Sequence, residues 1–83
     1  MNDKAKQLTL YSRAECHLCD QAEAMVMPII QHGQWHLVKV DIDSDPDLLE
    51  KYGFSIPVLL RDDTGQSLNW PFPPSRVKAL IES

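Results

Sequence analysis

The amino-acid sequence predicts an α/β fold with the element order β-α-β-α-β-β-α, in which helices pack against a mixed four-stranded sheet. Two observations lead to this expectation. Short β-prone runs alternate with helical segments over the first part of the chain, which requires a crossover and hence a parallel first pair of strands. The last two strands are separated only by the turn sequence DDTG, which allows an antiparallel pair.

The first strand and helix frame a junction that carries both cysteines of the chain. Residues 8–12, LTLYS, alternate apolar with polar side chains and predict a strand. From Leu18 to Ile30, apolar residues recur at spacings of three and four, which indicates an amphipathic helix packed on a core. Gly33 is a suitable stop for this helix. The segment CHLC therefore lies where a strand turns into a helix.

The second strand and helix are expected in the middle of the chain. Residues 35–43, WHLVKVDID, predict a strand whose near-continuous apolar part indicates a central position covered on both faces. Residues 45–53, DPDLLEKYG, then predict a short helix. Asp45 is its expected N-cap, Pro46 its first residue and Gly53 its left-handed stop.

The last part of the chain predicts a hairpin and a closing helix. The strands are expected at residues 56–61 and 66–70, and the helix at 76–82. The helix should turn Val77, Leu80 and Ile81 inward.

Composition limits the classes of function. The 83 residues, 43% hydrophobic and 24% charged, are expected to form a single domain over residues 1–83, which we expect to be a monomer. A formal charge of −4 disfavours nucleic-acid binding. No apolar run approaches the roughly 18 residues of a membrane span, and no apolar signal-peptide core is present, so a cytoplasmic location is expected. Thiols are kept reduced there, and structural disulfides are rare.

Cys16 and Cys19 admit three interpretations: a structural staple, a metal site or a working dithiol. A staple would close a loop of four residues and stabilise the fold by only about 2 kcal/mol. A zinc site would need further ligands, and the spacing of His17, His32 and His36 matches no common pattern. An iron–sulfur cluster would need cysteines from a partner chain, or glutathione, as further ligands. The open amides of a helix N-terminus stabilise a thiolate, which favours the dithiol, with Cys16 as the attacking and Cys19 as the resolving cysteine.

The order of elements, the C-x-x-C after the first strand and the Ile56–Pro57 pair that opens the third strand resemble the thioredoxin fold. Residues 8–82 resemble its smallest form, the glutaredoxins, and YSRAECHLC is similar to their opening motif. CHLC together with VDIDSDPDLLEKYGFSIPVLL is similar to the small bacterial glutaredoxin-like proteins. The resemblance implies a thiol–disulfide oxidoreductase that reduces or exchanges disulfides in protein substrates.

The resemblance also implies roles for residues around the dithiol. The Ile56–Pro57 peptide bond is expected to be cis, with the backbone of Ile56 pairing with an extended substrate. Arg13 stands at the family's basic position, and His17 can add positive charge beside the sulfurs. Trp70 is expected either to form an apolar wall at the site or to pack against the core.

The expected partners follow from the motifs that this sequence shares with glutaredoxins and from the motif that it lacks. Glutaredoxins hold glutathione with a Gly-Gly-x-Asp element, which is replaced here by NWPFPPSR. We therefore expect no bound cofactor and weak use of glutathione. The expected partners are protein disulfides, with a reductant of the thioredoxin-reductase type or glutathione. Two alternatives remain open: a binding module with an idle dithiol, and a metal or iron–sulfur carrier.

Overall fold

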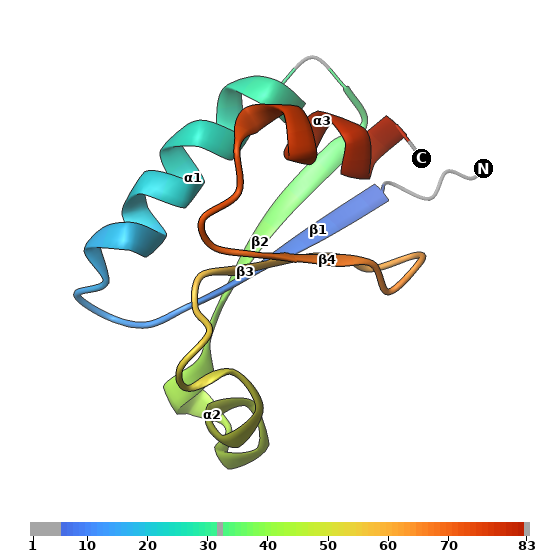
Figure 1. Ribbon diagram of the computed structural model, residues 1–83. Coiled ribbons are helices and arrows are strands. Elements are labelled where there is room, and N and C mark those ends of the chain that lie inside the picture. Colours follow the sequence, from blue (N-terminus) through green and yellow to red (C-terminus); the bar gives the residue numbers. More distant parts are fainter. Residues whose placement is uncertain (1–5, 32, 83) are drawn as a thin grey trace.

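The computed structural model describes residues 6–31 and 33–82, which form a four-stranded sheet with helices on one side and at one end (Figure 1). In chain order the elements are β1 (Lys6–Ser12), α1 (His17–Ile30), β2 (Trp35–Asp41), the short 3-10 helix η1 (Ile42–Ser44), α2 (Pro46–Tyr52), β3 (Val58–Arg61), β4 (Ser67–Asn69) and α3 (Pro74–Glu82). The predicted fold class and the order of helices and strands are confirmed.

The sheet has the strand order β2-β1-β3-β4. β1 pairs in parallel with β2 along its whole length and antiparallel with β3 on its other side. β3 pairs antiparallel with β4 across the turn at residues 62–65, where Gly65 has a φ of 81°. The sheet is therefore mixed, as the sequence predicts.

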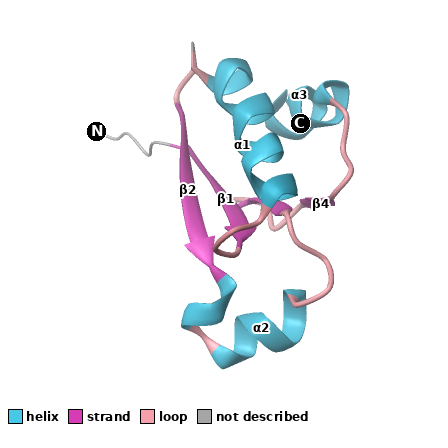
Figure 2. Ribbon diagram, turned by 90° about the vertical axis from the view of Figure 1, so that its left-hand side faces the viewer, coloured by secondary structure: helices cyan, strands magenta, loops and turns pink. Residues whose placement is uncertain are grey.

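The core lies between one face of the sheet and the helices α1 and α3, which are on the same side of it (Figure 2). α1 contributes Ala22, Val26 and Ile30, whose spacing of four places them on one face of the helix. The other buried apolar members of this cluster come from both central strands, α3 and the segment before it: Leu8, Leu10, Leu59, Phe72, Val77 and Leu80. The helix α1, which starts beside the dithiol, is thus fixed against the sheet.

The predicted central position of β2 is wrong, because β2 is an edge strand. Among the described strands it pairs with β1 alone, and β3 lies on the other side of β1. Val38 remains 39% exposed. The apolar run of β2 therefore does not indicate burial on both faces. The central, buried strands are β1 and β3.

The glycines expected to stop the first two helices act differently from the prediction. Gly53 has φ −53° and ψ −30°, which is right-handed. A Cβ at this position would lie 2.6 Å from the carbonyl oxygen of Leu49, so close approach is what requires glycine there. α1 ends at Ile30, before Gly33, whose N–H donates to the carbonyl of Ile30 at 3.1 Å.

The second strand ends two residues earlier than predicted because side chains form a turn after it. The carboxylate of Asp41 accepts from the N–H of Asp43 at 2.9 Å, and the hydroxyl of Ser44 donates to the carbonyl of Asp41 at 2.6 Å. α2 then begins as predicted, with Asp45 as N-cap and Pro46 in its first turn. α2 lies beyond one end of the sheet (Figures 1 and 2).

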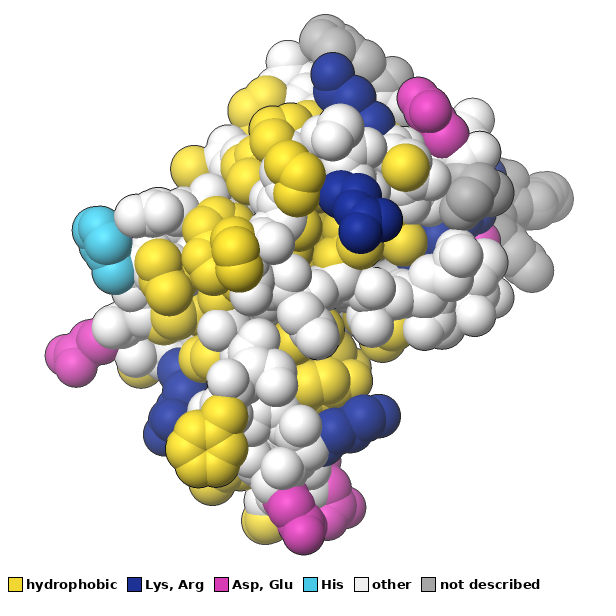
Figure 3. Space-filling view, in the orientation of Figure 1, with side chains coloured by type: hydrophobic (Ala, Val, Ile, Leu, Met, Phe, Trp, Pro, Cys, Tyr) yellow, Lys and Arg dark blue, Asp and Glu magenta, His cyan; other side chains and the backbone are white. Residues whose placement is uncertain are grey.

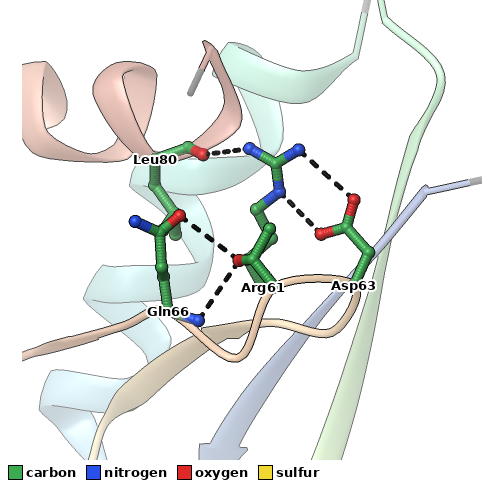
Figure 4. Close-up of polar contacts among 5 residues, drawn as sticks. Arg61, Asp63, Gln66 and Leu80 are labelled. Atoms are coloured by element: carbon green, nitrogen blue, oxygen red, sulfur yellow. Dashed lines mark hydrogen bonds and ion pairs between the residues drawn. The ribbon is translucent and has the colours of Figure 1, made fainter.

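A buried arginine links β3 to the end of α3 (Figure 4). Arg61 is only 4% exposed, and its Nη1 donates to the carbonyl of Leu80 at 2.6 Å. Its Nε donates to Asp63 at 2.7 Å, which is the main reason that the pKa of Asp63 lies below its ordinary value. The guanidinium also lies 4.8 Å from the centre of the Trp35 ring. One side chain thus satisfies a helix-end carbonyl and covers an aromatic ring.

We predict that Arg61→Met lowers the free energy of unfolding by about 2–3 kcal/mol, because it removes a buried, charged hydrogen bond to the Leu80 carbonyl together with the ion pair to Asp63. Urea denaturation followed by circular dichroism measures the change. Arg76→Met is the control, since Arg76 lies exposed on α3 and its loss should cost less than about 0.5 kcal/mol. Equal stability of the two variants would contradict the role given to Arg61.

Candidate redox site

Cys16 is the N-cap of α1 and stands at the end of the loop that leaves β1. Its backbone is extended, with φ −100° and ψ 104°, while the preceding Glu15 has a φ of 58°. The Sγ atom of Cys16 accepts from the backbone N–H of Cys19 at 3.1 Å. The sulfur thus faces the open amides of the helix, where a negative charge on it would be stabilised.

Cys19 lies one turn further along α1 and forms a disulfide with Cys16, with the two Cα atoms 5.2 Å apart. This separation is within the usual range for disulfides. Cys19 is only 3% exposed, whereas Cys16 is half-buried. An incoming reactant therefore reaches the sulfur of Cys16 first.

A hollow of about 230 Å³ lies next to the buried cysteine. Its walls are formed by Ser12, Arg13, Ala14, Cys19, Asp20, Lys39 and Asp41. The space is large enough for water. A large reactant therefore cannot reach Cys19, whereas water in the hollow can lie next to it.

Ile56 and Pro57 lie at the same end of the sheet as the dithiol loop. Tyr11 is paired with Val58, so the next residues of these antiparallel strands, Ser12 and Pro57, also lie opposite each other. The Ile56–Pro57 peptide bond is cis, as predicted. Within the described residues, neither the N–H nor the C=O of Ile56 has a hydrogen-bond partner. An extended chain can therefore pair with this residue.

The backbone of Trp70 contacts Pro57, and the side chain of Trp70 contacts the core. Its N–H donates to the carbonyl of Pro57 at 3.2 Å. The half-buried ring packs against the core cluster and meets Phe72 edge to face, with ring centres 5.2 Å apart. The structure thus places Trp70 as a support behind the Pro57 segment.

The two predicted cationic residues lie in different settings. Arg13 forms an ion pair with Asp43, with Nη2 3.0 Å from Oδ1 and Nε 3.2 Å from Oδ2. The pair is exposed and contributes little to stability, but it ties the dithiol loop to η1. His17 is the exposed first residue of α1, directly after Cys16.

Two exposed apolar residues near the site were not predicted from the sequence. Leu18, which the helical pattern assigns to the buried face, is 44% exposed between the two cysteines. Phe54 is fully exposed, two residues before Ile56. The signal for Phe54 was its place in the segment FSIP, since a large apolar residue in a loop is unusual unless it contacts something.

An aromatic pair holds α2 beside the dithiol end of β1. The rings of Tyr11 and Tyr52 are stacked with their centres 4.5 Å apart. Burial, followed by the nearby Tyr52, raises the pKa of Tyr11 above its ordinary value of 10.0. The Tyr11 hydroxyl is thus uncharged at neutral pH.

The residues that the structure describes offer no group of three or more metal-ligating side chains. His32, one of the histidines considered as a zinc ligand, lies outside the described residues. Of the helices in the described part of the chain, none is long and apolar enough to cross a membrane.

Residues 7–82 match the family model described as Glutaredoxin-like domain (DUF836). The chain belongs to this glutaredoxin-like family. The match covers nearly the whole sequence and includes the dithiol, Ile56–Pro57 and Trp70. No match was found among the curated proteins.

Solved structures agree with this assignment. Protein XcR50 from X. campestris, whose X-ray structure is known, shares 41% sequence identity with this chain. The match covers 90% of this chain and 95% of the XcR50 chain, with a TM-score of 0.76. Protein Ne2328 from Nitrosomonas europaea is 26% identical with 98% of both chains covered and a TM-score of 0.77. A mutant thioredoxin from Halobacterium salinarum shares the fold at 22% identity, with 94% of this chain and 73% of its own covered and a TM-score of 0.73. The thioredoxin fold of this glutaredoxin-like protein is thus shown.

We predict that, in the reduced protein, iodoacetamide modifies Cys16 at least about tenfold faster than Cys19, because Cys16 is accessible at the helix N-terminus and Cys19 is buried. Peptide mass spectrometry at several times gives both rates. In urea the two rates should converge, which serves as the control. Faster modification of Cys19 in the folded protein would contradict the assignment of the attacking sulfur.

Proposed function

We propose that this glutaredoxin-like protein is a thiol–disulfide oxidoreductase that reduces disulfides in protein substrates. The observation that carries the proposal is the asymmetry of the Cys16–Cys19 pair at the N-terminus of α1, with one sulfur accessible and the other buried. A structural staple does not require this asymmetry, whereas a two-step exchange does.

The reaction begins with the reduced dithiol. The thiolate of Cys16 attacks one sulfur of the substrate disulfide, whose S–S bond breaks, and the released substrate thiolate takes up a proton. Cys19 then loses its proton and attacks the Sγ of Cys16. This step forms the Cys16–Cys19 disulfide and releases the second substrate thiol. Two electrons have passed to the substrate, and the protein is left oxidised.

The cycle closes when an external reductant, either one dithiol or two molecules of a monothiol, reduces the Cys16–Cys19 disulfide and is itself oxidised to a disulfide. A reductant of the thioredoxin-reductase type, or glutathione, can supply these two electrons in the reducing cytoplasm. We favour the former. The glutathione-holding element of glutaredoxins is replaced by residues that include Pro73 and Pro74, which have no backbone N–H to donate.

The surroundings of the dithiol support a protein segment as substrate. Ile56 offers a backbone N–H and C=O that bond to no other described residue, and these are the groups that pair with an extended chain. Leu18 and Phe54 expose apolar side chains, and hydrophobic groups are visible on the lower part of the face in Figure 3. A protein segment can supply both a backbone for Ile56 and apolar side chains for Leu18 and Phe54, whereas a small disulfide has no peptide backbone to offer.

We predict that Cys19→Ser accumulates mixed disulfides with proteins of a cell extract, because the first step is retained and the second is removed. Non-reducing gels followed by mass spectrometry identify the trapped proteins. Cys16→Ser is the matched control and should trap none. Trapping by Cys16→Ser instead would reverse the roles, and no trapping or turnover by any form would favour an idle dithiol.

We predict that Phe54→Ser lowers kcat/KM for a protein disulfide by roughly 3- to 10-fold, because it removes an exposed aromatic contact. Reduction of a small symmetrical disulfide should be unchanged. Met27→Ser is the control, since Met27 is also an exposed apolar residue, at 46%, but lies far along α1 from Cys16. An equal loss for both kinds of substrate would show that Phe54 acts on the dithiol and not on the bound segment.

A further inference from the structure

The charge of the chain is unevenly distributed between the two ends of the sheet. Residues 13–20 and 41–52 hold seven carboxylates and two cationic side chains, for a formal charge of −5. The whole chain carries −4, so all the remaining residues together carry +1. The negative charge of this protein is therefore concentrated in two segments.

Both segments lie at the dithiol end. β1 and β2 are parallel neighbours, so the loop after Ser12 and the turn after Asp41 leave the same end of the sheet. The ion pair between Arg13 and Asp43 joins the two segments directly. Acidic side chains are visible at the lower left and at the bottom of the face shown in Figure 3.

Little of this negative charge is neutralised within the protein. Of the two cationic side chains, Arg13 is paired with Asp43, and Lys51 lies 5.3 Å from the centre of the Tyr52 ring. The carboxylates of these segments that form no ion pair with any described residue are Glu15, Asp20, Asp41, Asp45, Asp47 and Glu50. Because these charges have the same sign and lie at one end of the sheet, together they make the electrostatic potential at that end more negative.

We propose that this acidic end selects substrates by charge: the preferred partner is an extended protein segment that carries lysine or arginine side chains around its disulfide cysteine. The inference rests on the proposed function and names its substrate class. The acidic groups bind nothing by themselves. They attract a cationic segment to Cys16 and the backbone of Ile56, and they repel anionic thiol compounds such as glutathione.

The test uses three disulfide probes with the reduced full-length protein. Two peptide disulfides share one sequence around the cysteine and are flanked by three lysines or by three glutamates, and the third probe is a small uncharged disulfide. We expect kcat/KM for the lysine peptide to exceed that for the glutamate peptide by about tenfold or more at low salt. The ratio should approach one at high ionic strength, since salt screens exposed charges.

Two glutamate variants localise the effect. Glu15→Gln, beside Cys16, should lower the ratio of the two peptides about threefold, and Glu82→Gln, which removes the same charge at the end of α3, should leave it unchanged. The ratio cancels any change in the intrinsic reactivity of Cys16, because both peptides meet the same sulfur.

The outcomes separate the two proposals. Equal rates for both peptides at low salt, or the same loss of preference in both variants, overturn charge selection at this end while the uncharged disulfide is still reduced. Failure to reduce any of the three probes overturns the proposed function, and the inference with it. A salt-sensitive preference for the lysine peptide that depends on Glu15 supports the inference.

Discussion

The pairing of β1 on both sides is the constraint on which the rest of the structure depends. Its parallel partner β2 and its antiparallel partner β3 are both fixed in register to it. The end of β1 therefore meets the end of β2 and the beginning of β3. This brings together three segments that are distant in sequence: the dithiol loop, the acidic turn after Asp41, and Ile56–Pro57. The site exists because these segments follow strands that share one end of a sheet.

The difference between the two cysteines follows from the periodicity of α1. Cys19 stands three residues before Ala22 and seven before Val26, so it belongs to the buried stripe of the helix. Cys16 precedes the first turn and is held as the cap, outside that stripe. Packing of α1 on the sheet thus decides which sulfur is accessible. The same burial that stabilises the fold assigns different roles to the two sulfurs.

Local patterns predicted most of the elements, whereas the position of β2 in the sheet depends on contacts distant in sequence. The amphipathic spacing of α1, the Asp45–Pro46 helix start and the turn ending at Gly65 are all properties of short segments. The edge position of β2 depends instead on which strand takes the far side of β1, and its apolar run carries no such information. The sequence predicts a left-handed conformation at Gly53. In the structure the residue is right-handed, and glycine is required because a Cβ atom would lie too close to the Leu49 carbonyl.

The site could likewise be predicted only in part, because some of its contacts join residues that are distant in sequence. The cysteines and Ile56–Pro57 form recognisable motifs, so their residues could be named from the sequence. The pairing of Arg13 with Asp43 spans 30 positions and could not. Leu18 fits the apolar spacing of α1, yet it lies in the first turn, where it is 44% exposed. Surface position near a helix end is set by the tertiary structure and not by periodicity.

The most direct test of the redox account is a single-turnover experiment. The fully reduced protein is mixed with an equal amount of a disulfide-bonded protein, quenched with acid at successive times and analysed by intact-mass spectrometry. We expect this protein to lose two hydrogens, by forming the Cys16–Cys19 disulfide, at the same rate as the substrate gains two. A protein that keeps both thiols while the substrate keeps its disulfide would contradict the redox account.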